Sequence, residues 1–211
     1  LTPQLAFQLG RAGAYVLGSG NHKPSIVIGK DTRISGDMLE SALIAGICSM
    51  GGNVIQLGVM PTPGVAVLTR HFKADAGVVI SASHNPAEFN GIKFFNKDGF
   101  KLSDQEEEDI EALINEGISN LANPNEIGKV RRLEDANGRY NEFIKSTFPR
   151  GLRLDGIRIV LDCAHGAAYK VAPQVLWELG AEVIQIGTQP NGTNINDGVG
   201  ATSTALMAET V

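Results

Sequence analysis

Short apolar runs alternate with longer amphipathic segments along this chain, and that alternation restricts the fold more than any other feature of the sequence. An apolar run of this length is typical of a strand buried on both faces, and such a strand needs helices on both sides of its sheet. The alternation therefore predicts an α/β fold with a largely parallel sheet. The predicted strands are 25–31, 53–58 and 76–81, and the predicted helices are 3–18, 37–50 and 62–72.

A fourth strand is predicted at 91–95, "GIKFF", and the turn "NKDG" at 96–99 closes it. Ser103 and Glu106 then fit a capping box at the start of a helix. The acidic run that follows is interpreted as a solvated helix face. Residues 117–136 are rich in Asn, Gly and charge and are interpreted as a connecting excursion, with a further helix expected over 137–147.

The pattern restarts after 148–156, the best candidate for a domain boundary. "GGNVIQLG" at 51–58 matches "GAEVIQIG" at 180–187, and strand, helix and strand follow in the same order in both copies. We therefore predict two similar domains, 1–150 and 151–211, the second incomplete, and expect the chain to be an N-terminal fragment. The predicted elements of the second copy are a strand at 157–163, a helix at 167–180 and a strand at 182–187.

Composition argues against several classes of partner. A formal net charge of −5 disfavours nucleic acid and anionic membranes, which need clustered positive charge. The chain shows neither an apolar stretch of the ~18 residues of a membrane helix nor the features of a signal peptide, so a cytoplasmic location is expected. Cys48 and Cys163 are expected to be buried free thiols. The four histidines, His22, His71, His84 and His165, lack zinc-binding spacing.

Two loops with unusual chemistry follow predicted strands, where ligands of open parallel sheets bind. The first, "GKDTRISGD" at 29–37, places Arg33 just before a helix N-terminus, a position suited to anions. It is not a Walker A loop, and a solvated loop or a structural Lys–Asp pairing remains an alternative interpretation.

The second loop, "SASHNP" at 81–86, holds Ser83 at its tip, because Pro86 disfavours helix for the residue before it. The loop lacks the GxSxG pattern of a hydrolase nucleophile, so a polar turn is the competing interpretation. Lys93 lies in the otherwise apolar "GIKFF", where a lysine can act as a charge clamp or a proton carrier.

Several stretches together resemble the α-D-phosphohexomutase superfamily, and within it the bacterial phosphoglucosamine branch. They are "GKDTRISGDMLESAL", "MPTPGVAVLT", "GVVISASHNP", "NGIKFFNKDGFKLSD" and "PNGTNIN", spread over almost the whole chain. The resemblance implies domains of three-layer α/β/α architecture with mixed sheets. It also implies interconversion of glucosamine 6-phosphate and glucosamine 1-phosphate, on the route to UDP-N-acetylglucosamine.

In this family the serine that matches Ser83 carries the phosphoryl group. It passes that group to the sugar, giving glucosamine 1,6-bisphosphate as intermediate and activator. The resemblance also implies supporting roles for His84, Lys93 and Arg33, the last two as candidates for general acid/base transfer. Mg²⁺ would be held partly through the phosphate on Ser83, while the "DGDxDR" loop that supplies its aspartates is absent from these residues. The fragment is therefore expected to be inactive by itself.

Two positions depart from the family pattern. Phe89 stands where Asp usually precedes "NGIK", which puts a local hydrogen bond in doubt. His165 stands where Asn is common and is interpreted as a structural loop residue. Phosphomannomutase or phosphoglucomutase activity remains an alternative, as does a non-catalytic sugar-phosphate-binding module. The oligomeric state stays open, a homodimer included.

Overall fold

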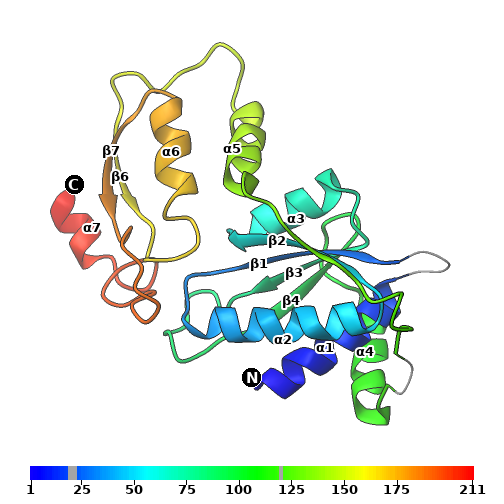
Figure 1. Ribbon diagram of the computed structural model, residues 1–211. Coiled ribbons are helices and arrows are strands. Elements are labelled where there is room, and N and C mark those ends of the chain that lie inside the picture. The colour runs from blue at the N-terminus through cyan, green and yellow to red at the C-terminus, as the bar shows by residue number, and fades with distance from the viewer. Residues whose placement is uncertain (19–22, 119–120) are drawn as a thin grey trace.

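Seven helices and seven strands form the described part of the chain, residues 1–18, 23–118 and 121–211 of a computed structural model (Figure 1). His22 lies outside these residues. The elements are α1 (Pro3–Leu17), β1 (Ser25–Lys30), α2 (Ser35–Ser49), β2 (Asn53–Val59), α3 (Thr62–His71), β3 (Ala76–Ile80), β4 (Ile92–Asn96), α4 (Asp104–Glu116), β5 (Val130–Arg132), α5 (Ala136–Thr147), β6 (Arg158–Asp162), α6 (Val171–Glu178), β7 (Glu182–Ile186) and α7 (Ala205–Thr210).

The larger sheet has five strands in the order β4-β3-β1-β2-β5. Strand β1 lies in the centre and runs parallel to both β2 and β3, and β5 runs parallel to β2. Strand β4 runs antiparallel to β3, so the sheet is mixed. The α/β class with a largely parallel sheet, predicted from the apolar pattern, and the mixed sheet, implied by the resemblance, are both confirmed.

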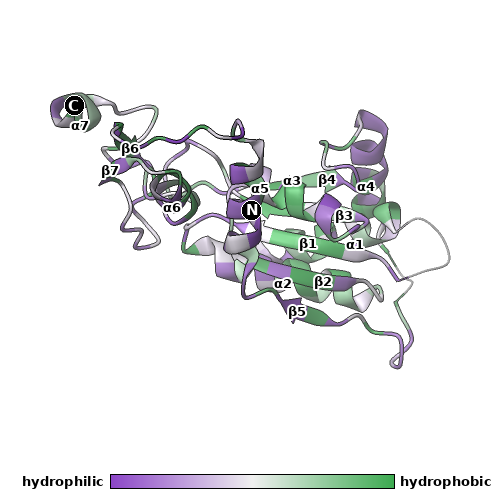
Figure 2. Cartoon of the chain, turned by 90° about the horizontal axis from the view of Figure 1, so that it is seen from above, coloured by the Kyte–Doolittle hydropathy of each residue, from purple (hydrophilic) through white to green (hydrophobic). Residues whose placement is uncertain are grey.

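Helices cover both faces of this sheet (Figure 1). On one face Ile26 and Ile28 of β1 pack in a cluster with residues of α1 and α2. On the other face Val27 packs with residues of α3 and α5. This alternation follows from the strand geometry, since successive side chains point to opposite faces. Figure 2 shows the resulting concentration of hydrophobic residues in β1 and β2.

Local chain chemistry explains the boundaries of β4 and α4. The side chain of Asn96 accepts hydrogen bonds from the backbone N–H groups of Asp98 (3.0 Å) and Phe100 (3.1 Å), which closes the predicted turn. The capping box is confirmed, because Ser103 accepts from the N–H of Glu106 while the Glu106 carboxylate accepts from the N–H of Ser103.

The prediction that 117–136 is only a connecting excursion was wrong in one respect. Residues Val130–Arg132 form β5, which pairs with β2 at the edge of the sheet. All three residues are exposed, so the segment carries none of the apolar pattern by which a buried strand is found in a sequence. The backbone ladder with β2, rather than side-chain burial, defines this strand.

The second copy of the repeat forms a smaller, two-stranded parallel sheet of β6 and β7, joined through α6. The strand–helix–strand order of β1–α2–β2 thus recurs in β6–α6–β7. The matching glycines agree in conformation as well. Gly51 (φ 85°) corresponds to Gly180 (φ 107°), and Gly58 (φ 72°) corresponds to Gly187 (φ 63°). Glycine tolerates this left-handed region without a Cβ clash, which accounts for its recurrence at both ends of the repeated segment.

Both cysteines are free thiols, Cys163 buried and Cys48 half-buried. Burial, aided by the negative charge of Asp162, raises the pKa of the Cys163 thiol to about 11. Burial also raises the pKa of Cys48.

We expect Cys163 to resist alkylation at pH 8. With a pKa of about 11 only about one thiol in a thousand is the reactive thiolate, so iodoacetamide should label Cys163 at least about 100-fold more slowly than an ordinary peptide thiol. The rate should rise with pH, because the thiolate population rises. Peptide mass spectrometry over a time course measures this, with Cys48 as the internal comparison. Labelling of Cys163 at the rate of an unfolded control would contradict the prediction.

Within the described residues, no helix combines the length and apolar character required to cross a bilayer.

Candidate functional site

The loops that follow β1 and β3 lie side by side because these two strands are parallel neighbours in the sheet. The backbone N–H of Asp31, just beyond β1, donates to the carbonyl oxygen of Ile80 at the end of β3 (3.0 Å). The two polar loops singled out in the sequence, 29–37 and 81–86, therefore meet beyond the carboxyl ends of the strands, as expected.

The loop between β3 and β4 presents Ser83 to solvent. Its base is closed by a hydrogen bond from the N–H of Ser81 to the carbonyl oxygen of Gly91 (2.8 Å). Within it, the N–H of Ser83 donates to the hydroxyl oxygen of Ser81 (3.1 Å). Ser83 adopts a left-handed conformation (φ 57°), which is uncommon for a residue with a side chain. Such a conformation persists only where surrounding contacts stabilise it. The backbone of this loop at Ser83 is therefore fixed by its neighbours.

Arg33 makes two of the hydrogen bonds that fix the backbone of the Ser83 loop. Its side chain is buried, only 2 % of the residue being exposed, and its guanidinium forms an ion pair with the buried carboxylate of Asp31. The same guanidinium donates through Nη2 to the carbonyl oxygens of Ser83 (3.2 Å) and Asn85 (2.6 Å). Arg33 thus contacts the backbone of the Ser83 loop, and the fixed fork of the guanidinium suits several acceptors at once.

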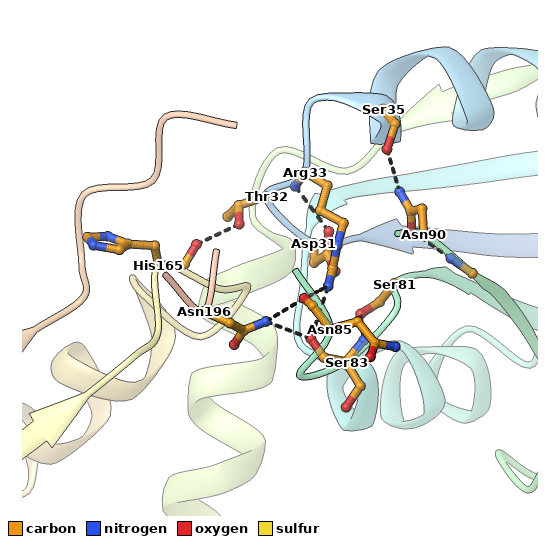
Figure 3. Close-up of polar contacts among 11 residues, drawn as sticks. Asp31, Thr32, Arg33, Ser35, Ser81, Ser83, Asn85, Asn90, His165 and Asn196 are labelled. Atoms are coloured by element: carbon orange, nitrogen blue, oxygen red, sulfur yellow. Dashed lines mark hydrogen bonds and ion pairs between the residues drawn. The ribbon is translucent and has the colours of Figure 1, made fainter. Parts of the chain in front are cut away.

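The Ser83 side chain points away from the Arg33 guanidinium (Figure 3). Ser83 and His84 are both exposed at the tip of the loop. Lys93 is exposed on β4, opposite Val79 in the ladder with β3. The structure therefore brings Arg33 into direct contact with the Ser83 loop and leaves the side chains of Ser83, His84 and Lys93 accessible to a ligand from solvent.

Lys30, the last residue of β1, has a different role. It forms ion pairs with Asp37 and Glu40 of α2. Burial by itself would lower the pKa of Lys30, but the hydrogen bonds and charges of the two carboxylates outweigh it and raise the pKa above its ordinary value. Lys30 therefore stays charged and ties β1 to α2, in line with the alternative reading of this loop as holding a structural Lys–Asp pair.

Residues far along the chain also reach this site. The hydroxyl of Thr32 donates to the carbonyl oxygen of His165 (2.6 Å), and the N–H of Ile34 donates to the carbonyl oxygen of Gly192 (2.8 Å). The side-chain amide of Asn196 donates to the carbonyl oxygens of Ser83 (3.0 Å) and Asn85 (2.9 Å), the two that Arg33 also contacts. Sequence reasoning placed Thr32 in the 29–37 loop but did not predict its contact with His165. It did not single out Asn196, whose one signal was its position at the end of the quoted motif "PNGTNIN".

His165 holds loops together. Its Nδ1 accepts from the N–H of Gln189 (3.1 Å), its own N–H donates to the carbonyl oxygen of Gly187 (2.6 Å), and its carbonyl oxygen accepts from Thr32. These contacts agree with its interpretation as a structural loop residue.

Phe89 lies in the same loop as Ser83 with 60 % of its surface exposed, and its N–H donates to the carbonyl oxygen of Pro86 (3.1 Å). Nothing in the structure explains the aromatic side chain at this position.

The described residues do not by themselves fit a magnesium site. Among residues 1–18, 23–118 and 121–211, no group of three or more His, Cys, Asp or Glu side chains is arranged to hold a metal ion. The carboxylate of Asp31, at the centre of the site, is not free to bind a metal ion, because the residue is 4 % exposed and paired with Arg33.

A mixed sheet with helices on both faces is a three-layer α/β/α arrangement. Residues 1–120 match the family described as phosphoglucomutase/phosphomannomutase, alpha/beta/alpha domain I. The chain belongs to this family.

Curated relatives that match the whole chain include the phosphoglucosamine mutases of Rhodospirillum rubrum, 57 % identical over 212 residues, and of Geotalea uraniireducens, 58 % identical over 213 residues. In both cases the match covers 47 % of the relative, so the chain spans about half the length of the curated relatives it matches.

Solved structures share the fold. A putative phosphomannomutase from Thermus thermophilus superposes with a TM-score of 0.80 at 26 % identity, covering 100 % of this chain and 48 % of that one. A phosphoglucomutase/phosphomannomutase family protein from Burkholderia thailandensis superposes with a TM-score of 0.74 at 24 % identity, covering 91 % of this chain and 42 % of that one.

Proposed function

We propose that the protein to which this chain belongs interconverts glucosamine 6-phosphate and glucosamine 1-phosphate through a phosphorylated Ser83. The observation that carries the proposal is the Ser83 loop itself. It presents an accessible hydroxyl in a left-handed backbone conformation, while the buried Arg33 fixes the carbonyl groups of Ser83 and Asn85. The names of relatives more than half identical to the chain support the choice of sugar.

The proposed reaction has two transfers. In the first, a sugar hydroxyl attacks the phosphorus on Ser83 and its proton passes to a base, while the bond from phosphorus to Ser83 Oγ breaks and this oxygen takes up a proton. The product is glucosamine 1,6-bisphosphate, which reorients. In the second, Ser83 Oγ gives up its proton and takes the other phosphoryl group, and the sugar oxygen that leaves regains a proton. Phosphoryl transfer depends chiefly on alignment of the reacting groups and on neutralising oxygen charge. A serine whose loop backbone is fixed by hydrogen bonds meets the first of these requirements.

The neighbouring side chains have proposed roles in this scheme. His84 and the exposed Lys93 would contact the phosphate and the sugar hydroxyl, with Lys93 as a candidate for the proton transfer. Arg33 would act beside them by fixing the loop through the carbonyl oxygens of Ser83 and Asn85. The ligand of the site would be a sugar phosphate. We propose a cytoplasmic location for the protein, with a homodimer as one candidate assembly.

For Mg²⁺ we propose only which groups would bind it. When bound, Mg²⁺ would neutralise phosphate oxygens, and the phosphate on Ser83 would be one of its ligands. We assign the carboxylate ligands to residues outside this chain, since the described residues hold no suitable group.

Glucosamine 1,6-bisphosphate would serve as intermediate and activator. We also propose the division into domains 1–150 and 151–211, and that the 211-residue chain alone is inactive.

A coupled assay of the full-length protein tests the proposal. We expect turnover of glucosamine 6-phosphate in the presence of Mg²⁺ and 1,6-bisphosphate, and an intact mass that shows one phosphoryl group, mapped by peptide mass spectrometry to Ser83. Parallel assays with mannose and glucose phosphates test the alternative sugar preferences. A protein without turnover and without phosphate on Ser83 would instead support a non-catalytic sugar-phosphate-binding module.

A further inference from the structure

Two carbonyl oxygens of the Ser83 loop each receive two hydrogen bonds from side chains. The carbonyl oxygens of Ser83 and Asn85 both accept from Arg33 Nη2, and both also accept from Asn196 Nδ2 (Figure 3). A carbonyl oxygen has two lone pairs, so the two side chains together satisfy both carbonyl groups. The two carbonyl groups flank His84, and the carbonyl of Ser83 belongs to the residue that carries the proposed phosphate. The amide of Asn196 is therefore the second side-chain group, after the Arg33 guanidinium, that fixes the backbone of this loop.

Asn196 is itself held in place by the end of the smaller sheet. It adopts a left-handed conformation (φ 61°), and its N–H donates to the carbonyl oxygen of Ala164 (2.9 Å). The carboxylate of Asp162, the last residue of β6, accepts from the N–H groups of Ala164 (2.8 Å) and Gly200 (2.7 Å). Ala164 is left-handed as well (φ 52°). Uncommon backbone conformations of this kind persist where surrounding contacts stabilise them.

The geometry points to Asn196 as a positioning residue for phosphoryl transfer at Ser83, an inference that rests on the proposed function. Asn196 does not contact the Ser83 hydroxyl. It acts through the backbone carbonyl groups of Ser83 and Asn85, and it makes the alignment of the Ser83 loop depend on the 158–200 segment. The segment after β6 thus contributes to the site by fixing the nucleophile's backbone.

Two variants of the full-length protein test this role. Asn196→Gly keeps the left-handed backbone accessible and removes the amide, whereas Asn196→Asp keeps the shape and replaces the NH₂ donor by an acceptor that faces two carbonyl oxygens. Lys73→Gly is the matched control, since Lys73 is also exposed and left-handed (φ 50°) but follows α3, away from the site.

We expect kcat to fall about ten- to hundredfold in both Asn196 variants, because a small misplacement of reacting groups has an effect of this size. KM should stay within about twofold, since the change affects alignment more than ground-state binding. Hydrogen exchange of the amides in 82–85 should accelerate in the same variants. Lys73→Gly should leave kcat, KM and this exchange unchanged.

Each outcome decides the matter. If exchange in 82–85 and kcat match the Lys73→Gly control, Asn196 does not position the loop. If exchange accelerates while kcat is unchanged, Asn196 is structural only and the inference is wrong. If the wild-type protein has no mutase activity, the proposed function fails, and the role of Asn196 in positioning Ser83 for phosphoryl transfer fails with it. The exchange measurement would still show separately whether Asn196 clamps the loop.

Discussion

Ser83→Ala in the full-length protein is expected to reduce turnover of glucosamine 6-phosphate by at least about 10⁴-fold, because loss of a covalent nucleophile removes the whole reaction path. The fold should survive. The hydroxyl of Ser83 points to solvent, while the backbone N–H and carbonyl of this residue, which alanine retains, make the hydrogen bonds that hold the loop. The coupled assay gives the rate, and circular dichroism with the thermal unfolding midpoint reports the fold.

The matched control is Ser146→Ala. Ser146 is an exposed serine of α5 whose hydroxyl donates within its own helix, to the carbonyl oxygen of Phe143 (2.6 Å). This variant should keep full turnover and the phosphoryl group in its intact mass, whereas Ser83→Ala should lose both. Turnover of Ser83→Ala within about tenfold of wild type would remove Ser83 from the proposed role.

Arg33→Met is expected to lower the free energy of unfolding by about 3–5 kcal/mol, because it leaves the buried carboxylate of Asp31 without its partner. The same change removes both hydrogen bonds from Nη2 to the Ser83 loop, so turnover should be lost as well. Urea unfolding monitored by fluorescence measures the stability change. Arg153→Met, at an exposed pair with Asp155, is the matched control and should leave the unfolding midpoint almost unchanged.

A double variant separates the charge effect from the loop contacts. Asp31→Asn together with Arg33→Met removes the uncompensated charge and should recover a large part of the lost stability without restoring turnover. If Arg33→Met alone unfolds at the wild-type urea midpoint, the buried ion pair of Arg33 with Asp31 does not contribute to the stability of the fold.

Much of the larger sheet was predictable from the sequence because its strands are buried on both faces. The apolar runs at 25–31, 53–58 and 76–81 correspond closely to β1, β2 and β3. Strand β5 was not predictable, since its exposed residues 130–132 are defined by a backbone ladder with a distant partner. Helix α6 begins at Val171, four residues later than predicted, because residues 166–169 form a turn in which the N–H of Tyr169 donates to the carbonyl oxygen of Gly166 (3.2 Å).

The sequence by itself determined the α/β class, the repeated segment and the position of Ser83 at the tip of a loop, because each depends on local chemistry and short-range pattern. Only the tertiary structure showed what holds that loop. Arg33 lies 50 residues from Ser83 along the chain and Asn196 lies 113 residues from it, yet both donate to the same carbonyl oxygen. Hydrogen bonds from side chains to distant backbone groups leave no periodic pattern in a sequence. They arise only when parallel strands bring their carboxyl ends together and the segment after β6 reaches the same edge of the sheet.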